Sequence, residues 1–323
     1  MLQTVSMPLQ RAVLAEFGSW ENVGRRLAGL GVDGLEGIWC GEDFGPDLAV
    51  LKSLVHGYHL TFFPDWLDFY REDKAALRCK FGSWERAESF YGGWGGGHLL
   101  EIYRQDLARA RALGAQYVVF HVSDVSLEEG QTYRWLHSNE EVIDAALEVI
   151  NRLLGDIDQA DFDFLVENQW WPGFTFTEPA QTERLLAGIG YPRKGIMLDF
   201  GHLMNTNWEL RDEAEGAAYV QAMLERHGEL AAYVRGVHLH QSLSGAYVKT
   251  HTGSLPDYWP EDYLKRWQVS YSQVMEIDQH RPWSSPAVLP VLERLSPAYL
   301  THELRDGWRA LEVQSRLLRG LGS

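Results

Sequence analysis

The sequence predicts an α/β fold, a closed (β/α)8 TIM barrel in which residues 1–323 form one domain. Apolar segments with strand character alternate with amphipathic helical segments along the chain, which is the order of a parallel barrel. The length suits one such barrel, and no low-complexity linker or change of composition marks a second domain. A doubly wound open sheet is the alternative, but no glycine-rich turn follows the first predicted strand.

The predicted strands are short apolar segments rich in β-branched and aromatic residues. In chain order they are 12–17, 34–39, 57–62, 116–122, 163–168, 195–200, 234–240 and 298–303. Apolar residues three or four positions apart predict helices at 99–114, 138–157, 177–190 and 211–228. Ser138 followed by Glu141 has the spacing of a capping box, which supports a helix start there.

Two connections are much longer than the others, 63–97 after the third strand and 241–285 after the seventh. Both follow strand ends, so a barrel places these long loops on the face that carries active sites. The glycines at 92–97 could form a hinge, and a rigid, merely packed insertion is the alternative. The tryptophan-rich segment 63–97 is expected to contact a large, partly apolar ligand or a second copy of the chain in a homo-oligomer.

Composition and charge limit the classes of partner. A net charge of −16 disfavours nucleic acid, because phosphate backbones are bound through Lys and Arg. The two cysteines, Cys40 and Cys79, lie in no metal-binding spacing, and a reduced, cytoplasmic protein is the simplest interpretation. The N-terminal residues lack a signal-peptide pattern, and no apolar run reaches about 18 residues, so no membrane association is expected.

Polar, ionisable residues lie near the carboxyl end of each predicted strand. They are Glu16, Glu36, His59, His121, Glu167, Asp199, His238 with His240, and His302 with Glu303. Because side chains alternate across a strand, Glu167 shares a face with Leu165, Asp199 with Met197, and His238 with His240. If these faces point inward, the carboxylates and imidazoles meet at the barrel mouth.

Such a gathering of buried charges is costly unless a cation lies among the side chains. Mixed Glu, Asp and His ligands suit Zn, Mn, Fe or Co, and Mg remains an option for the carboxylates. The alternative to metal binding, for each acid taken singly, is an ordinary salt bridge. For His59 and His121 the alternative is a hydrogen-bonded position in the core. We expect ordinary structural or solvated roles for His56, His98, His137, His227 and His280.

In strand order, these residues resemble the xylose isomerase-like TIM barrels of the AP endonuclease 2 family. This group includes sugar epimerases, sugar-phosphate isomerases and endonuclease IV. The resemblance rests on a Glu, an Asp with a His three residues later, a His and a final Glu, here Glu167, Asp199, His202, His238 and Glu303. It implies one divalent metal ion held by Glu167, Asp199, His238 and Glu303.

The resemblance to endonuclease IV implies a larger site. In that enzyme, histidines on strands 3 and 4 and a later Asp-x-His complete a three-metal centre. This chain has His59 and His121, and in "KTHTG" it has His251, with Lys249 in the place of the aspartate. We therefore include His59, His121, His202 and His251 among the expected metal ligands. The Glu and Arg that epimerases use to bind substrate correspond to Gly173 and Ser244.

The first functional hypothesis is a metal-dependent sugar or sugar-phosphate isomerase or epimerase. Glu167 and Glu303 would move a proton next to a carbonyl, through a metal-stabilised enediolate. The expected substrate contacts are His202, His240, Glu36, Trp94, Trp170, Trp171 and Trp259. The alternative is an endonuclease IV-like phosphodiester hydrolase with two or three metal ions, acting on a small substrate rather than DNA. A third hypothesis is a non-catalytic barrel that binds a ligand.

Overall fold

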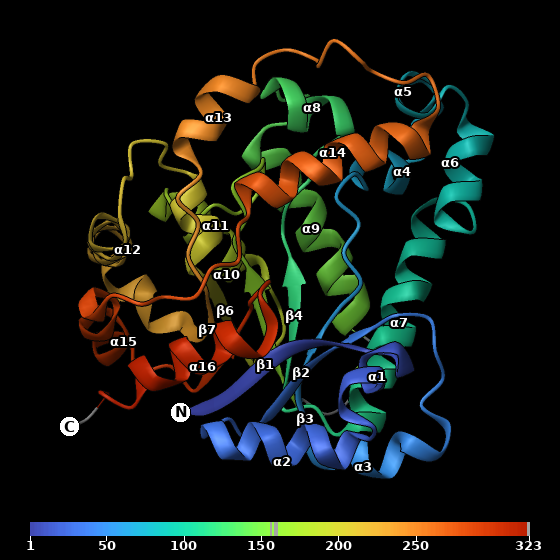
Figure 1. The fold of residues 1–323 in the computed structure, drawn as a ribbon. Coiled ribbons are helices and arrows are strands. Elements are labelled where there is room, and N and C mark those ends of the chain that lie inside the picture. The colour runs from blue at the N-terminus through green and yellow to red at the C-terminus, as the bar shows by residue number, and fades with distance from the viewer. Residues whose placement is uncertain (156, 158–160, 322–323) are drawn as a thin grey trace.

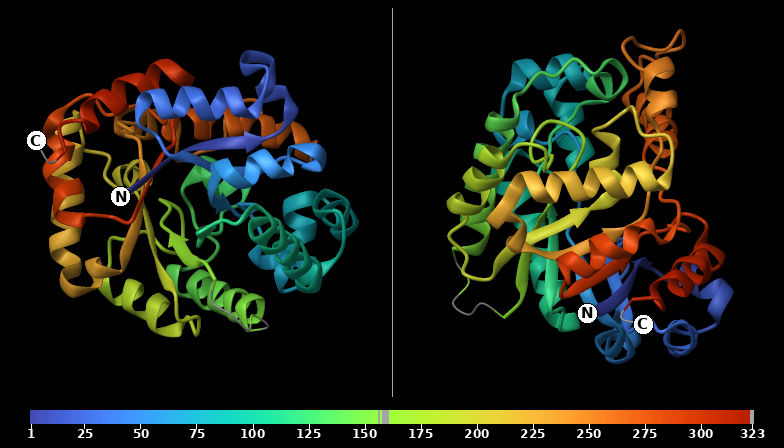
Figure 2. Two further views of the ribbon diagram at one scale, coloured as in Figure 1. Left: turned by 90° about the horizontal axis from the view of Figure 1, so that it is seen from below. Right: turned by 90° about the vertical axis from the view of Figure 1, so that its left-hand side faces the viewer.

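The computed structural model describes residues 1–155, 157 and 161–321 and contains a closed barrel of parallel strands in the order β1 to β8. Figure 2 shows the helices arranged around these strands. The predicted (β/α)8 fold is therefore confirmed. The strands are β1 Leu2–Leu9, β2 Gly34–Trp39, β3 Val55–His59, β4 Tyr117–His121, β5 Asp163–Glu167, β6 Lys194–Asp199, β7 Val234–Leu239 and β8 Tyr299–His302.

Seven of the predicted strands are confirmed to within three residues, but the first prediction is wrong. Residues 12–17 form a 3-10 turn and the short helix α1 (Leu14–Phe17), and β1 lies earlier in the chain. The strand Leu2–Leu9 has little apolar alternation because Thr4 points inward and hydrogen bonds across the barrel to Tyr117 and Thr301. Glu16 consequently lies on α1, exposed and away from any strand end.

The predicted helices are confirmed, and others complete the outer layer. They are α2 Trp20–Leu30, α3 Leu48–Leu54, α7 Gly95–Leu113, α9 Asn139–Leu154, α10 Pro179–Gly188, α12 Glu213–His227, α15 Leu289–Leu295 and α16 Gly307–Leu318. The capping box of α9 is present: Ser138 Oγ accepts from Glu141 N, and the Glu141 carboxylate accepts from Ser138 N. None of the described helices is long and apolar enough to cross a membrane.

The two long connections are largely helical rather than irregular loops. The first contains α4 Leu67–Tyr70, α5 Lys74–Phe81 and α6 Trp84–Tyr91, and the second contains α13 Gly245–His251 and α14 Tyr263–Ile277. Figure 1 shows α13 and α14 above the carboxyl ends of the strands, with α8 (Leu127–Thr132), and α4 to α6 at one side. A Cβ at Gly96 would lie 2.8 Å from the Tyr70 carbonyl oxygen, so close packing explains this glycine.

The barrel interior and the outer layer have separate apolar cores. Tyr117, Val119, Leu165, Met197 and Tyr299 fill the interior. Alternate strand residues, such as Val118, Phe164, Val166, Ile196 and Leu198, pack toward the helices. Leu165 and Met197 thus lie inside, and the same alternation turns Glu167 and Asp199 toward the barrel axis, as the strand pattern predicts.

Candidate metal centre

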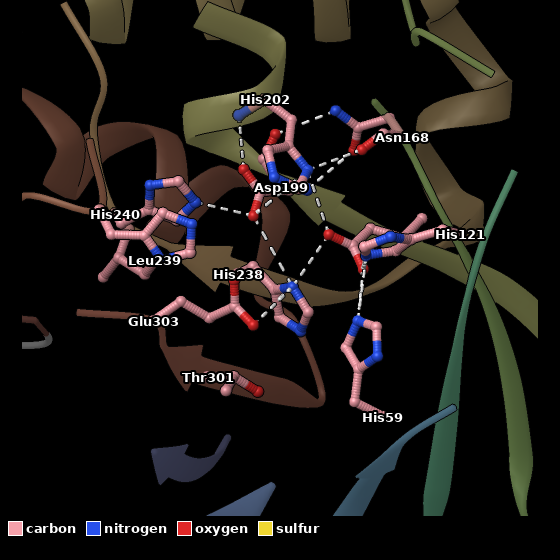
Figure 3. A network of polar contacts seen from close by, with 12 residues as sticks. His59, His121, Asn168, Asp199, His202, His238, Leu239, His240, Thr301 and Glu303 are labelled. Carbon is pink, nitrogen blue, oxygen red and sulfur yellow. Dashed lines mark hydrogen bonds and ion pairs between the residues drawn. The ribbon is translucent and has the colours of Figure 1, made fainter. Parts of the chain in front are cut away.

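Imidazole and carboxylate side chains from β3 to β7, and from residues directly after β7 and β8, meet at the carboxyl end of the barrel (Figure 3). Strand ends supply them, because parallel strands in a barrel all finish on one face. The residue Glu303 directly follows β8, and His202 lies on the short helix α11 (Phe200–Asn205). The group comprises His59, His121, Glu167, Asp199, His202, His238, His240 and Glu303.

Glu167 lies at the middle of this group and is fully buried. Its Oε2 is 2.7 Å from His121 Nε2 and 3.2 Å from His59 Nε2. Its Oε1 is 3.2 Å from both His238 Nδ1 and His202 Nδ1. Burial opposes ionisation, but the neighbouring His121 and His238 hold the pKa of Glu167 well below its usual value. Glu167 therefore stays ionised and connects two sides of the site.

Asp199 explains why a buried strand ends on a carboxylate with a histidine three residues later. Its Oδ1 accepts a hydrogen bond from His202 N, so Asp199 caps α11 and fixes the start of that helix. Its Oδ2 is 2.8 Å from His240 Nε2 and 3.7 Å from His238 Nδ1. One residue thus positions His202 and adds a carboxylate to the site.

A third part of the site was not predicted from the sequence. Asp278 Oδ2 lies 3.3 Å from His202 Nε2 and 2.5 Å from His280 Nε2. The ring of His280 stacks on His240 with centroids 4.2 Å apart. His280, for which an ordinary structural or solvated role was expected, thus contacts residues of the site. The signal was present as the Asp-x-His of "DQH", residues 278–280, at the end of the second long connection.

His251 is not brought to this site. It lies exposed on α13, where its ring stacks on Tyr247 at 4.1 Å and its Nδ1 contacts the Tyr247 carbonyl. Lys249, on the same helix, pairs with Glu209. Helical geometry places His251 one turn after Tyr247 and points it toward solvent. Asp278 and His280, which have the same Asp-x-His spacing, do lie beside His202 and His240.

The side chains present fit divalent cations. Ligand atoms lie within 4.8 Å of one another in several overlapping groups, among them His59, His121 and Glu167; Glu167, Asp199 and His202; Asp199, His240 and Glu303; and His202, His240, Asp278 and His280. Nitrogen and oxygen donors of this kind suit Zn, Mn, Fe or Co. The buried Nδ1 of His240 has no hydrogen-bond partner in the described structure, as expected of an atom kept for a ligand.

No ion pair described for these side chains involves Lys or Arg, so the acids are balanced only by imidazoles. Burial alone would lower the pKa of His59, but Glu167 raises it to about 9. Burial would also lower the pKa of His280, but Asp278 raises it to about 9. Buried positive charge is thus favoured at both ends of the site, and bound cations would supply it.

Aromatic residues cover the site on two sides. Phe62 lies against His121 with ring centroids 4.2 Å apart, and Trp170 lies 5.2 Å from His202. Trp170 also packs against Trp171, with ring centroids 4.2 Å apart and planes tilted by 40°, within an apolar cluster that includes Val248 of α13 and Ile277 of α14. Sequence reasoning expected both tryptophans near the substrate, and the structure places Trp170 beside a member of the site.

Three other expected substrate contacts, Trp94, Trp259 and Glu36, have different surroundings. Trp94 precedes α7, packs on Trp84 at 5.1 Å and hydrogen bonds to Glu72, within the first long connection. Trp259 lies between α13 and α14, near Arg266. Glu36 is fully buried against His238 rather than in an open space for substrate.

Gln169 joins the site without having been predicted. Its Nε2 lies 3.1 Å from His202 Nδ1 and 3.4 Å from His121 Nδ1, and its Oε1 is buried without a hydrogen-bond partner among the described residues. An uncharged glutamine two positions beyond Glu167 carries no metal-binding signature in sequence, which is why it escaped notice. The amide nitrogen of Gln169 therefore lies close to both histidines.

A family model described as xylose isomerase-like TIM barrel matches residues 97–283, more than half of the chain. The chain belongs to this family. The match includes β4 to β7 and thus His121, Glu167, Asp199 and His238. A comparison with curated proteins finds no match for this member of the family.

Solved structures with the fold of this xylose isomerase-like barrel include a D-tagatose 3-epimerase-like protein, at 15% identity and a TM-score of 0.55, covering 99% of this chain and 97% of that one. Endonuclease IV from Thermus thermophilus has 16% identity and a TM-score of 0.54, with 99% and 98% covered. A sugar phosphate isomerase/epimerase from Parabacteroides distasonis has 13% identity and a TM-score of 0.51, with 98% and 94% covered. At such identities the likeness establishes the fold alone.

Proposed function

We propose that this protein is a hydrolase that uses two or three divalent metal ions to cleave a phosphoester bond in a small, carbohydrate-like substrate. The observation that carries the proposal is the engagement of both oxygens of Glu167. His59 and His121 flank one oxygen, and His202 and His238 flank the other. A carboxylate held in this way is suited to bridge two cations and is poorly placed to carry a proton to and from a substrate.

The residues divide naturally among three ions. His59, His121 and Glu167 would hold one ion. Glu167, Asp199 and Glu303, which all lie near His238 Nδ1, would hold a second ion together with His238. His202, Asp278 and His280 would hold the third, with His240 beside them. This division matches the three-metal pattern implied by the resemblance to endonuclease IV, with Asp278 and His280 as its later Asp-x-His.

Bound divalent ions would supply an activated water and would neutralise charge on the phosphoryl oxygens. The protein orients the ligand groups: Asp199 holds His202 through the cap of α11, and Glu167 spaces the two halves of the site. Phe62 and Trp170 exclude bulk water. The Glu303 side chain is 10% exposed, whereas those of Glu167 and Asp199 are fully buried, so Glu303 is the carboxylate of these three best placed to touch the substrate.

A small substrate is favoured over DNA. The described ion pairs of the site include no Lys or Arg that would track a phosphate backbone, and the chain carries a net charge of −16. The relatives named as sugar epimerases and isomerases favour a carbohydrate-like skeleton. We expect abasic-site DNA to be neither bound nor cleaved at low salt.

A sugar isomerase or epimerase is the second candidate, favoured by one observation. Among the described ion pairs, Glu303 has only a long contact of 3.6 Å to His238, so it is the acid of the site freest to exchange a proton. Against this candidate, Gly173 stands where the family's epimerases place a substrate-binding Glu. Its φ is +126°, and a Cβ there would lie 2.3 Å from the Val122 carbonyl oxygen, so a glutamate does not fit this backbone.

The test compares two reactions in two variants. The first assay follows hydrolysis of p-nitrophenyl phosphate and bis-p-nitrophenyl phosphate with added Mn²⁺ or Zn²⁺. The second follows deuterium uptake from D2O into ketoses. The double variant His59→Asn/His121→Asn should lose hydrolysis by ~100-fold or more, since a whole ligand group is removed. The control His227→Asn alters a buried histidine on α12, stacked on Phe176, and should keep activity. Deuterium uptake that survives the double variant would instead establish the second candidate.

A further inference from the structure

Glu36 of β2 is a fully buried carboxylate that lies inside the barrel directly against His238. Its Oε2 is 3.1 Å from His238 Nε2, and its Oε1 is also 3.1 Å from that nitrogen. Neither the substrate nor solvent reaches it, since its exposure is 0%. Its position raises the question of what an unexposed acid does beneath a metal-ligating histidine.

The two nitrogens of His238 face different surroundings. Nδ1 faces three carboxylates, with Glu167 Oε1 at 3.2 Å, Glu303 Oε1 at 3.6 Å and Asp199 Oδ2 at 3.7 Å. Nε2, on the opposite edge of the ring, faces Glu36. A cation shared by the three carboxylates would therefore be bound through Nδ1, which leaves Nε2 to carry the proton.

Glu36 is itself held from below. Thr301 Oγ1 donates to Glu36 Oε2 at 2.9 Å, and Thr301 in turn hydrogen bonds to Tyr117 at 2.9 Å and Thr4 at 3.0 Å. All of these side chains are fully buried. This polar layer fixes the Glu36 carboxylate in one orientation, with its free acceptor capacity directed at His238.

We propose that Glu36 is a positioning residue that accepts the Nε2–H of His238 and so keeps the lone pair of Nδ1 directed at the metal. The inference rests on the metal centre of the proposed function but not on which reaction that centre performs. Carboxylates that orient ligating histidines in this way fix the tautomer and the ring plane, and their loss typically costs 10–100-fold in metal affinity.

The competing interpretation is that Glu36 is itself a ligand, because Glu36, His238 and Glu303 also lie within ligand distance of one another. An ion between Glu36 and Nε2 would sit on the edge of the ring away from Asp199 and Glu167. Nδ1 would then carry the ring proton, and His238 could not bind a cation together with those two carboxylates. The geometry therefore points to a proton rather than a metal ion between Glu36 and His238.

The test uses the full chain and zinc. We compare wild type with Glu36→Gln, which keeps the shape but removes the charge, and with Asp106→Asn as a control. Asp106 is an equally buried carboxylate that accepts from Tyr58 and Thr61 N, away from the metal centre. Stepwise zinc affinity is measured by chelator competition, and the protonated nitrogen of His238 is identified by ¹⁵N NMR of the zinc-loaded protein.

We expect wild type to show a protonated Nε2 on His238. Glu36→Gln should lower the affinity for one of the zinc ions at least 10-fold and alter the Nε2–H signal of His238. Asp106→Asn should change neither the zinc affinity nor this signal. Equal zinc affinity and an unchanged signal in Glu36→Gln would overturn the inference, as would anomalous scattering that places zinc on the Glu36 carboxylate. Zinc binding without phosphoester hydrolysis would refute the proposed function alone, and a wild-type chain that binds no zinc would refute both.

Discussion

Lys80 provides the sharpest test of how the first long connection is fastened to the barrel. It lies on α5, its side chain is 7% exposed, and its Nζ is 2.6 Å from Asp65 Oδ1 and 2.7 Å from Asp68 Oδ2. Asp124, which follows β4, accepts from Trp66 N nearby and ties the same connection to the barrel. Replacing Lys80 with Met keeps the length of the side chain and removes its charge.

The expected loss of stability follows from the burial of Asp65 and Asp68, the partners of Lys80. Removing one member of a buried ion pair costs about 3–5 kcal/mol, because an uncompensated charge remains. Burial already raises the pKa of Asp65, so protonation of Asp65 relieves part of that cost. The expected destabilisation therefore lies near the lower end of this range. At about 2.1 cal/mol/K per residue, the entropy of unfolding of this chain is roughly 0.7 kcal/mol/K. Lys80→Met should therefore lower Tm by about 4–5 °C at pH 7.

Calorimetry of a matched pair of variants checks the value. Arg184→Met removes a bidentate pair with Asp144, with both distances at 2.7 Å, in which both side chains are about half exposed. Exposed pairs contribute about 1 kcal/mol or less, so this control should shift Tm by no more than about 1–2 °C. The reasoning fails if Lys80→Met is no more harmful than Arg184→Met.

Four further outcomes are expected. Stripping metal with a chelator should lower Tm by about 4 °C for each site that had been held at 100 times its Kd, and an unchanged melting curve would contradict the metal centre. Burial opposes ionisation of Asp68, but His137 and Lys80 lower its pKa to about 2 from 3.8. Asp68 should therefore add about 2 kcal/mol above pH 4 that is lost as the pH falls to 2, and acid unfolding of Asp68→Asn should lack this component. Gly173→Ala, at a φ of +126°, should destabilise the fold by about 3 kcal/mol in urea unfolding. Ser138→Ala should cost about 1 kcal/mol through the lost cap of α9, and a neutral result would contradict the capping role.

Local patterns in the sequence were sufficient for the fold class and for most of the strands. Alternation with a period of two is a property of the strand itself, so it places Glu167 on the face of Leu165 and Asp199 on the face of Met197 without knowledge of the neighbours. The capping pattern of Ser138 and Glu141 is equally local, since both hydrogen bonds lie within one helical turn. Strand β1 was not predicted because its inward Thr4 hydrogen bonds to residues more than one hundred positions away in the sequence.

The remaining features depend on contacts between distant segments, which only the tertiary structure decides. Asp278 reaches His202 across 76 residues of sequence, because the second long connection folds back over the strand ends. The position of Glu36 beneath His238 spans 202 residues and depends on closure of the barrel. His251 has the right residue type, but its helical phase directs it to solvent. The sequence thus determines which side chains of a strand share a face, whereas barrel closure and the path of the long connections determine which face points inward and which side chains meet.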